Sequence, residues 1–272
     1  MNNNPKISVV TVCYNAASEI ERTIKSVINQ TYSNVEYIII DGGSKDGTVD
    51  LIKKYADKIT YWVSEPDKGI YDAMNKGITA ATGDWINFLN AGDWYCHKSI
   101  IAEVVSYTLL HEKADILYGS IYNVCDEYHY QLDPFELSNM GKFMPLLHPA
   151  SFVKASYHKS HLFDVSYKSS GDYHFFYNAY YEHNAAFARI SVITTYFDAT
   201  KGMSKDNLQI VRMENFRLRK KRRYMLPLYR LSWFVQDAKH FIKNHCMSKT
   251  FLTNRLKKQG YVLIPNTDLW IN

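Results

Sequence analysis

Four short apolar runs, each followed by a polar turn, are the feature that most limits how this chain can fold. These runs cover residues 7–13, 35–40, 59–63 and 85–89. Segments with a helical pattern lie between them, at residues 20–28, 48–55 and 71–80. The run at 35–40 is apolar at nearly every position, which is typical of a strand covered on both faces. Strands that alternate with helices favour a parallel sheet. We therefore predict an α/β fold with a mostly parallel central sheet flanked by helices.

Polar residues follow the ends of these predicted strands. Tyr14, Asp41, Glu65 and Asp93 each come after one of the four runs. Ligands of parallel α/β sheets bind beyond the carboxyl ends of the strands, so one crevice is expected to collect these residues. Neither the glycine fingerprint of dinucleotide sites nor the lysine-bearing phosphate loop is present. The sequence therefore predicts a ligand site of another class at this edge.

The pattern changes along the rest of the chain. We expect helices at 100–110 and 171–182 and extended segments at 116–124 and 186–197, while residues 120–147 follow no clear pattern. Ser18 and Glu21 have the spacing of a capping box for the first helix. From about residue 206 basic residues crowd together, and apolar residues then recur at helical spacing. We predict a body at 1–205 and a basic, amphipathic helical extension at 206–272.

Composition narrows the class of protein. The net charge of +5 is modest, and 46% hydrophobic residues with 22% charged residues indicate a globular chain. The four cysteines lie far apart without a CxxC pair, so neither a zinc site nor a disulfide framework is indicated. The start lacks the apolar run of a signal peptide, and no stretch is long enough to span a bilayer. We expect a cytoplasmic protein. Its 22 tyrosines suit the stacking of flat ligands or saccharides, or reflect a bias of composition.

Several motifs together resemble a known family. "SVVTVCYNA", "SVINQTYSNVEYIIIDGGSKDGT", "EPDKGIYDAMNKGI" and "GDWINFLNAGD" have the order and spacing of family 2 glycosyltransferases. The chain is most similar to the group that makes bacterial capsule, exopolysaccharide and lipopolysaccharide. "HPASFVKAS", "SSGDYHFF" and "KGMS" resemble later segments of that group. The resemblance covers about residues 6–204 and implies a GT-A type, Rossmann-like fold. It also implies a donor half at about 1–95 and an acceptor half at about 96–205.

The resemblance implies a donor site for a nucleotide sugar, with UDP as the expected nucleotide. The residues that match its positions are Tyr14, Asn15, Asp41, Gly43, Asn75, Lys76, Asn90 and Asp93. A tyrosine face stacks on a flat base, and a carboxylate accepts a base N–H. Gly43 allows close backbone approach, although a plain turn remains an alternative for the glycines. Many family members carry a second aspartate after the position of Asp41, where this chain has Gly42.

A metal ion is expected at Asp93. Asp93 closes a loop directly after a strand, where a carboxylate is able to bind Mg²⁺ or Mn²⁺ and the ion would bridge a diphosphate. In the alternative interpretation, Asp93 caps the helix that starts near His97. The usual motif of the family is a run of aspartates, and here Asn90 and Gly92 replace two of them. Asn90 is still able to hydrogen-bond a ribose.

Asp172 is the candidate catalytic base. It matches the acidic position of the acceptor-side motif of the family and stands at the start of a predicted helix. An inverting transfer needs one carboxylate to take the proton of the attacking hydroxyl. Helix capping is the alternative role for this aspartate. His148 matches a histidine of the same group, and it either contacts the phosphates or the acceptor or is a core histidine.

The basic extension has two interpretations. A polybasic cluster beside an amphipathic helix suits an anionic membrane surface, with contact expected at 206–245. The alternative is a solvated helix packed on the body. Nucleic acid would attract the same charges, but no nucleic-acid motif accompanies them, so we expect no nucleic-acid partner.

The function that these features favour is an inverting hexosyl- or N-acetylhexosaminyl-transferase. It would use a UDP-sugar to extend a cell-surface glycan, with a saccharide or lipid-linked acceptor, as a peripheral protein on the inner face of the cell membrane. One alternative is a catalytically impaired module that only binds nucleotide sugars, which the eroded aspartate run allows. A sugar-nucleotide pyrophosphorylase is the other. It is disfavoured because Tyr14-Asn15-Ala16 stands where that class has a glycine-rich, Arg- and Lys-bearing loop.

Overall fold

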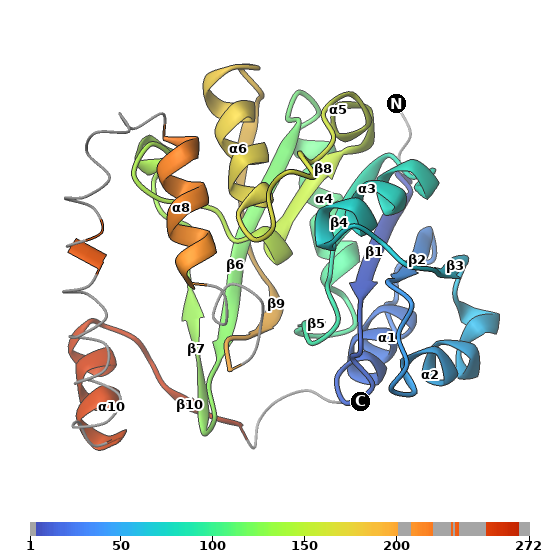
Figure 1. Cartoon of the computed structure of the whole chain (residues 1–272), viewed down its shortest axis with the longest axis horizontal. Coiled ribbons are helices and arrows are strands. Elements are labelled where there is room, and N and C mark those ends of the chain that lie inside the picture. Colours follow the sequence, from blue (N-terminus) through green and yellow to red (C-terminus); the bar gives the residue numbers. More distant parts are fainter. Residues whose placement is uncertain (1–3, 201–207, 220–229, 231, 234–248, 267–272) are drawn as a thin grey trace.

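The donor half alternates strands with helices as the sequence predicts. The computed structural model describes residues 4–200, 208–219, 230, 232–233 and 249–266 (Figure 1). The elements of the donor half are β1 (Ile7–Cys13), α1 (Ile20–Ile28), β2 (Val35–Asp41), α2 (Thr48–Lys54), β3 (Tyr61–Ser64), α3 (Ile70–Ala80) and β4 (Trp85–Phe88). Each predicted strand and helix of residues 7–89 is therefore confirmed, with ends that differ by a few residues.

The second half is richer in strands than the sequence suggests. Its elements up to residue 198 are β5 (Trp94–Tyr95), α4 (Ile100–Leu110), β6 (Ile116–Val124), β7 (Tyr128–Leu132), β8 (Ser151–Lys154), α5 (Ala155–Ser160), α6 (Gly171–Tyr181) and β9 (Phe187–Asp198). Three further elements are α8 (Leu208–Leu218), α10 (Lys249–Lys258) and β10 (Ile264–Pro265). The segment 120–147, which has no clear sequence pattern, contains the end of β6 and the whole of β7, and these two strands pair antiparallel.

One sheet runs through both halves in the order β10-β7-β6-β8-β4-β1-β2-β3, and β9 pairs with β6 and β5. The strands β1 to β4 are parallel to one another in register. β8 is antiparallel to both β4 and β6, and so joins the two halves. The predicted mostly parallel central sheet is confirmed in the donor half, and antiparallel pairs are common in the second half. The carboxyl ends of β1 to β4 therefore lie at one edge.

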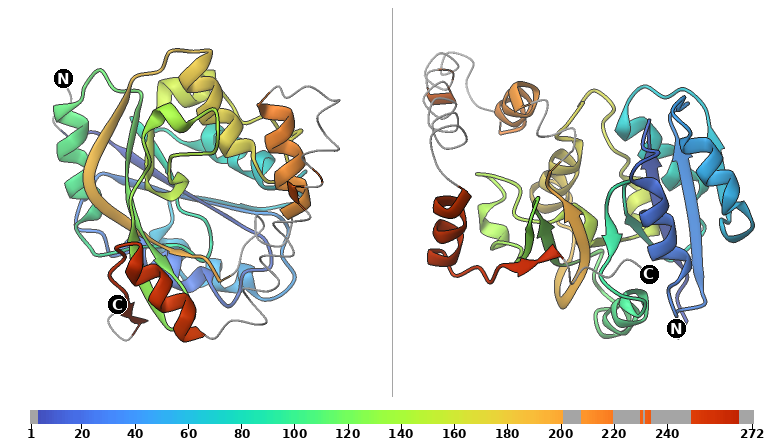
Figure 2. Two further views of the ribbon diagram at one scale, coloured as in Figure 1. Left: turned by 90° about the vertical axis from the view of Figure 1, so that its left-hand side faces the viewer. Right: turned by 90° about the horizontal axis from the view of Figure 1, so that it is seen from below.

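Helices cover both faces of the sheet (Figures 1 and 2). Residues of β1 alternate between two apolar clusters: Val9 packs with α1, α2 and α4, and Val10 packs with α3, α5 and α6. The two-residue period of a strand produces this alternation. α3 lies so close to β1 that a β-carbon added at Gly77 would overlap Cγ1 of Val10. Close packing of α3 fixes the position of the loop that precedes it.

The predicted capping box is wrong. α1 begins after Glu19, and no side chain caps its first turn. Oε1 of Glu21 instead accepts hydrogen bonds from Lys54 Nζ at 2.8 Å and Tyr55 OH at 2.6 Å. Glu21 therefore joins α1 to the end of α2, because two charged or hydroxyl donors are better partners than its own helix terminus.

α8 belongs to the body, although it lies beyond the predicted boundary at 205. Its Leu218 is 5% exposed and is part of the core beside α3, α5 and α6. Figure 1 shows α8 next to α6. Most of the predicted membrane-contact segment, residues 220–229, 231 and 234–245, lies outside the described residues. Among the helices that the structure describes, none combines the length and apolar character needed to cross a bilayer.

Candidate functional site

The loop after β2 is held together by Asp41. Its side chain is fully buried. Oδ2 accepts the backbone N–H groups of Gly43 at 3.1 Å and Ser44 at 2.9 Å, and the hydroxyl of Ser64 at 2.6 Å. Oδ1 accepts the Ser44 hydroxyl and the Cys13 thiol. These hydrogen bonds lower the pKa of the Asp41 carboxyl, against the effect of burial. A fully ionised Asp41 therefore shapes the loop, and its contact with a nucleotide stays a prediction.

Two neighbouring residues complete the ends of β1 and β2. Asn15 has a positive φ of 49°, receives Lys45 N–H on its Oδ1 at 3.0 Å, and donates its own N–H to Ser44 Oγ at 2.7 Å. Gly43 has a φ of 83°, a conformation that favours glycine. The ring of Tyr14 is 65% exposed beside this loop. Hydrogen bonds therefore hold the backbone of this loop, while the exposed Tyr14 side chain is able to stack on a flat ligand.

The loop after β4 brings carboxylates together. Asp93 is 6% exposed, and its Oδ1 accepts the N–H of Asp198 at 3.3 Å. Burial, and then the nearby Asp198 carboxylate, raise the pKa of Asp93 to about 8, while Arg22 opposes this shift. Arg22 pairs with Asp198 at 3.8 Å and lies over the Trp94 ring. This neighbourhood has more negative than positive charge when both carboxyls ionise, which suits a cation.

The donor atoms at this loop fit a hard divalent ion. Oδ1 of Asn90 is buried and has no hydrogen-bond partner among the described residues. Carboxylate and amide oxygens are the ligands that Mg²⁺ and Mn²⁺ take. Within the described ranges, no three His, Cys, Asp or Glu side chains form a metal cluster. Asp93 is thus the protein ligand that such an ion would use, and the rest of its coordination would come from water and phosphate oxygens.

Asn75 and Lys76 of α3 already have protein partners. The Asn75 side chain donates to Phe163 O and accepts from Phe163 N, both at 2.9 Å, and so ties α3 to the segment after α5. Lys76 Nζ is 2.7 Å from Glu65 and 3.9 Å from Asp72. These acids raise the pKa of Lys76 and keep it charged. The donor contacts of both residues stay predictions.

Asp172 lies in the first turn of α6 and is linked to the donor half. Tyr71, in the first turn of α3, donates its hydroxyl to Asp172 Oδ1 at 3.1 Å. A β-carbon on Gly171 would lie 2.8 Å from three atoms of the Tyr71 ring, so a glycine permits this close approach. Asp172 also accepts the N–H of Tyr173 at 2.9 Å. The carboxylate is partly exposed, and these two donors hold it in place.

His148 begins a 3-10 turn between β7 and β8. Rings of Phe88, Phe163 and Phe176 surround it with centroid distances of 5.6, 6.0 and 5.9 Å. Burial lowers the pKa of His148, although the Asp172 carboxylate acts in the opposite direction. The imidazole is therefore neutral near pH 7. This packing favours the core interpretation, and its contact with phosphate or acceptor stays a prediction.

Two residues of this region are missed by sequence reasoning. Tyr71 lies in the quoted segment "EPDKGIYDAMNKGI", and Asp198 ends β9 just before "KGMS". Only the fold reveals them, because Tyr71 is 101 residues from Asp172 and Asp198 is 105 residues from Asp93.

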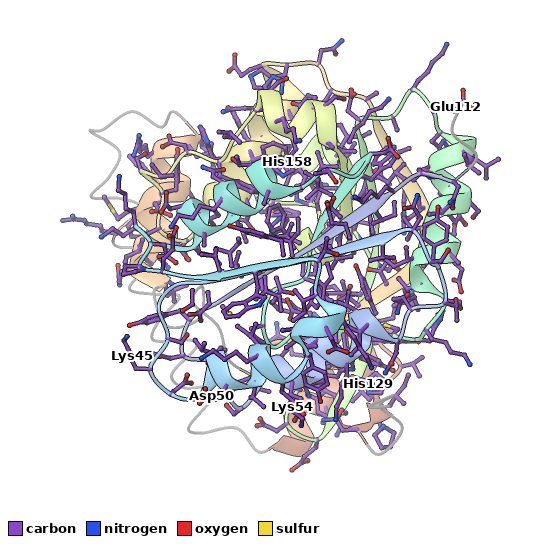
Figure 3. All side chains as sticks on the ribbon, turned by 90° about the vertical axis from the view of Figure 1, so that its right-hand side faces the viewer. Lys45, Asp50, Lys54, Glu112, His129 and His158 are labelled. Carbon is purple, nitrogen blue, oxygen red and sulfur yellow. The ribbon has the colours of Figure 1, made fainter. Side chains whose placement is uncertain are left out.

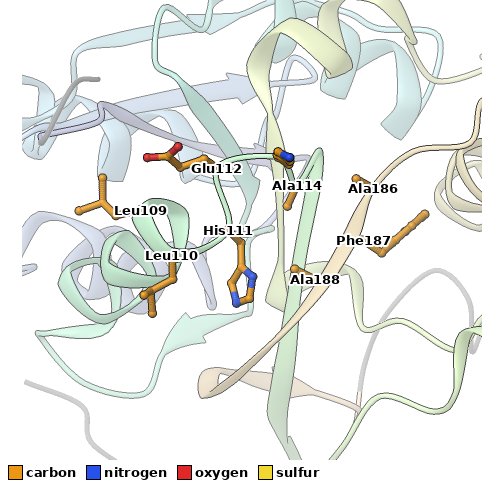
Figure 4. Close-up of a pocket in the computed structure, with 9 residues that line it drawn as sticks. Leu109, Leu110, His111, Glu112, Ala114, Ala186, Phe187 and Ala188 are labelled. Carbon is orange, nitrogen blue, oxygen red and sulfur yellow. The ribbon is translucent and has the colours of Figure 1, made fainter.

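An open hollow of about 440 Å³ lies elsewhere, between the end of α4 and the start of β9 (Figure 4). Leu109, Leu110 and Phe187 contribute apolar walls to it. None of the predicted site residues lines this hollow. It is therefore separate from the strand ends that carry the predicted donor residues.

Comparison with known proteins agrees with this architecture. Residues 8–162 match the family described as Glycosyl transferase family 2, which is more than half of the chain. The chain therefore belongs to the glycosyltransferase family 2.

Curated relatives match parts of the chain. "Uncharacterized glycosyltransferase MT1564" of Mycobacterium tuberculosis is 42% identical over 106 residues, which are 39% of this chain and 40% of the relative. A "PGL/p-HBAD biosynthesis glycosyltransferase" of Mycobacterium bovis is 32% identical over 43% of this chain and 47% of the relative. A Rickettsia typhi glycosyltransferase is 29% identical over a match that covers 72% of this chain and 62% of the relative. The matches span about two fifths to three fifths of these relatives.

Solved structures show the same fold. Staphylococcus aureus TarS in complex with UDP-GlcNAc has a TM-score of 0.60 at 18% identity and covers 76% of this chain and 65% of that chain. A mannosyltransferase of Pyrobaculum calidifontis, in complex with GDP-Man and Mn²⁺, has a TM-score of 0.55 at 18% identity and covers 70% and 56%. At these identities the likeness establishes a GT-A-like α/β fold.

Proposed function

We propose that the protein is an inverting glycosyltransferase that moves a sugar from UDP to an acceptor hydroxyl. The observation that carries the proposal is the link between Tyr71 and Asp172 at 3.1 Å. It places a carboxylate of the second half against α3, the helix that follows the β3 loop of the donor edge. This hydrogen bond between the two halves supports a role for Asp172 as the base beside the donor edge.

The donor would lie at the strand ends. The exposed Tyr14 ring offers a stacking face for the base. Oδ1 of Asn90, which has no hydrogen-bond partner within the described part of the chain, offers an acceptor for a ribose hydroxyl. Asp93 would hold Mg²⁺ or Mn²⁺. Such an ion, when bound, supplies positive charge against the departing diphosphate. The Mn²⁺ that accompanies GDP-Man in the complex of the Pyrobaculum mannosyltransferase supports a divalent ion.

The transfer step needs one proton acceptor. Asp172 takes the proton of the acceptor hydroxyl while the oxygen forms a bond to the anomeric carbon of the sugar. The bond from that carbon to the diphosphate oxygen breaks, and UDP leaves with the electron pair. Attack from the face opposite the diphosphate inverts the anomeric centre. The Tyr71 hydroxyl would keep the Asp172 carboxylate oriented for the acceptor hydroxyl.

We further infer a lipid-linked glycan of the cell envelope as acceptor, reached from the inner membrane surface. The support is the basic cluster of the extension, together with the Mycobacterium bovis relative, whose name assigns it to PGL/p-HBAD biosynthesis. UDP-GlcNAc bound to TarS supports a UDP-linked hexose or N-acetylhexosamine as donor.

The experiment that tests the activity is UDP release from a panel of UDP-sugars, with Mn²⁺, with Mg²⁺ and with a chelator. We expect slow, metal-dependent hydrolysis of at least one donor in the absence of acceptor. Asp50→Asn, which changes an exposed carboxylate of α2, is the matched control for acidic substitutions and should behave as wild type. Binding of UDP without any turnover, in every condition and with lipid extract as acceptor, would favour the impaired binding module instead.

A further inference from the structure

A carboxylate that binds the nucleobase needs an oxygen that is available to accept a hydrogen bond, and Asp41 has none available. Both oxygens of Asp41 are occupied, by two backbone N–H groups, two hydroxyls and a thiol. A base N–H would have to displace one of these donors and open the loop after β2. Burial of a carboxylate with broken hydrogen bonds is costly. A different acidic residue is therefore better placed to accept a hydrogen bond from the nucleobase.

Asp67 lies where a side chain of residue 42 would lie. A β-carbon added at Gly42 would be 2.6 Å from Oδ2 of Asp67 and 3.3 Å from Cδ2 of the Tyr14 ring. The Asp67 carboxylate and the exposed Tyr14 ring thus both lie beside Gly42. Gly42 leaves space that Asp67 occupies from the neighbouring loop.

The orientation of Asp67 is fixed by one of its two oxygens. Oδ1 accepts the N–H of Gly69 at 2.8 Å. Oδ2, the atom beside Gly42, has no hydrogen-bond partner among the described residues. One oxygen therefore holds the side chain in place, and the other is available to a ligand next to the Tyr14 ring.

We propose that Asp67 is the residue that recognises the nucleobase, by accepting a ring N–H while the base stacks on Tyr14. The proposal deepens the proposed function and rests on it. Uracil and guanine carry a ring N–H beside a carbonyl, whereas cytosine and adenine carry a lone pair at the corresponding position. A carboxylate attracts the first pair of bases and repels the second. Asp67 thereby selects uridine or guanosine diphosphates against cytidine and adenosine diphosphates.

Asp67→Asn is the direct test, because asparagine keeps the acceptor for Gly69 and replaces the free oxygen with a group that donates. Calorimetric titration with UDP, GDP, CDP and ADP in Mn²⁺ measures the selectivity. Wild type should prefer UDP or GDP over CDP by at least about tenfold, since a hydrogen bond to a charged group is worth about 10- to 100-fold in affinity. In Asp67→Asn the affinity for the preferred nucleotide should fall by about the same factor. The affinities for that nucleotide and for CDP should then differ by no more than about threefold.

A chemical change in the ligand provides an independent test. UDP methylated at N3 of uracil has no ring N–H. It should bind wild type about 10- to 100-fold more weakly than UDP, and should bind Asp67→Asn about as well as UDP does. Gly42→Ala should reproduce the loss with an intact Asp67, because the added methyl group displaces its Oδ2. Asp50→Asn, on the outer side of α2 (Figure 3), should match wild type in every titration.

The outcomes separate this inference from the proposed function. If UDP or GDP binds wild type and Asp67→Asn leaves affinity and selectivity unchanged, the role of Asp67 is overturned while the glycosyltransferase activity stands. If no nucleoside diphosphate binds wild type with Mn²⁺, both are overturned. Equal binding of UDP and N3-methyl UDP by wild type also rejects Asp67 as the base-reading residue.

Discussion

At the scale of single residues, the ionised form of Asp93 is unfavourable in the folded protein. Its carboxyl is buried beside the Asp198 carboxylate, and the pKa of Asp93 is raised to about 8. A stable fold alone would favour an uncharged residue here, because burial of a charge costs free energy unless it is paired. Strongly shifted pKa values cluster at functional sites. A bound cation would offset the cost by stabilising the ionised form.

Asp93 should make stability fall as pH rises. Between about pH 4 and pH 8 the unfolded chain has lost the Asp93 proton, whose ordinary pKa is 3.8, while the folded chain keeps it. The folded state then binds more protons than the unfolded state, so a rise in pH favours unfolding. Thermal melts without metal should therefore show Asp93→Asn equal to wild type near pH 4 and more stable by a few degrees near pH 8. Asp50→Asn should follow wild type, and parallel curves for Asp93→Asn would contradict a raised pKa.

Asp172 and Tyr71 should affect turnover in different degrees. Asp172→Asn removes the proposed proton acceptor and should lower the rate of sugar transfer by about 10²- to 10⁴-fold with UDP affinity unchanged. Tyr71→Phe removes only the hydroxyl that orients the carboxylate, so we expect a loss of about tenfold or less, in kcat rather than in the KM of the donor. Steady-state kinetics of both variants measure this split. Near-normal turnover of Asp172→Asn would remove it from catalysis.

At the scale of elements, α8 positions the start of α6. The side chain of Glu214 accepts the backbone N–H groups of Lys168 at 2.6 Å, Ser169 at 3.1 Å and Ser170 at 2.8 Å. These three residues directly precede the turn that carries Asp172. The guanidinium of Arg217 also lies 5.0 Å from the centre of the Tyr167 ring. A helix beyond the predicted boundary thus fixes the loop before the candidate base.

Glu214→Gln should lower turnover without weakening the binding of the nucleotide donor. A glutamine side chain is uncharged and has one oxygen acceptor in place of two. It is therefore unable to accept charge-assisted hydrogen bonds from all three N–H groups. We expect kcat to fall several-fold to about tenfold and the melting temperature to fall by a few degrees, with the Kd of UDP unchanged. Glu112→Gln, in the exposed turn after α4 (Figure 3), is the matched control. Loss of UDP binding together with kcat would show that Glu214 supports the fold as a whole.

The elements differ in how much of them the sequence predicts. β1 to β4 and the helices between them are predicted because local apolar patterns decide them. β7 is missed because it is only five residues long and buries a polar residue, His129, while Tyr128 and Tyr130 beside it are only partly buried. The site is predicted in outline from the residues after the strands. The hydrogen bonds of Glu214 and the position of Asp67 beside Gly42 depend on packing between distant segments, which no local pattern encodes.

At the scale of the whole molecule, the basic segment is attached to the body on both sides. Before it, α8 packs on α6 through Leu218. After it, β10 pairs antiparallel with β7, and Asn266 donates to Cys125 O at 2.8 Å. Deleting the chain from residue 206 would therefore remove Glu214 and an edge strand as well as positive charge. Membrane binding has to be tested by changing charges within the intact chain.

Replacing Lys220, Lys221, Arg222 and Arg223 together with glutamine should release the protein from anionic membranes. Each basic side chain near such a surface contributes about 1 kcal/mol, so four contribute on the order of 10²- to 10³-fold in partitioning, and salt screens the effect. Sedimentation with phosphatidylglycerol vesicles at low and high salt measures it, with neutral vesicles for comparison. The matched control replaces four exposed lysines of the body, Lys53, Lys58, Lys98 and Lys113, and so removes the same charge. Wild type and this control should sediment at low salt, whereas the cluster variant should stay in the supernatant with its UDP affinity intact. Equal release of both variants would show that net charge alone attracts the protein, and a wild type that remains in the supernatant at low salt would show that the basic cluster does not bind membranes.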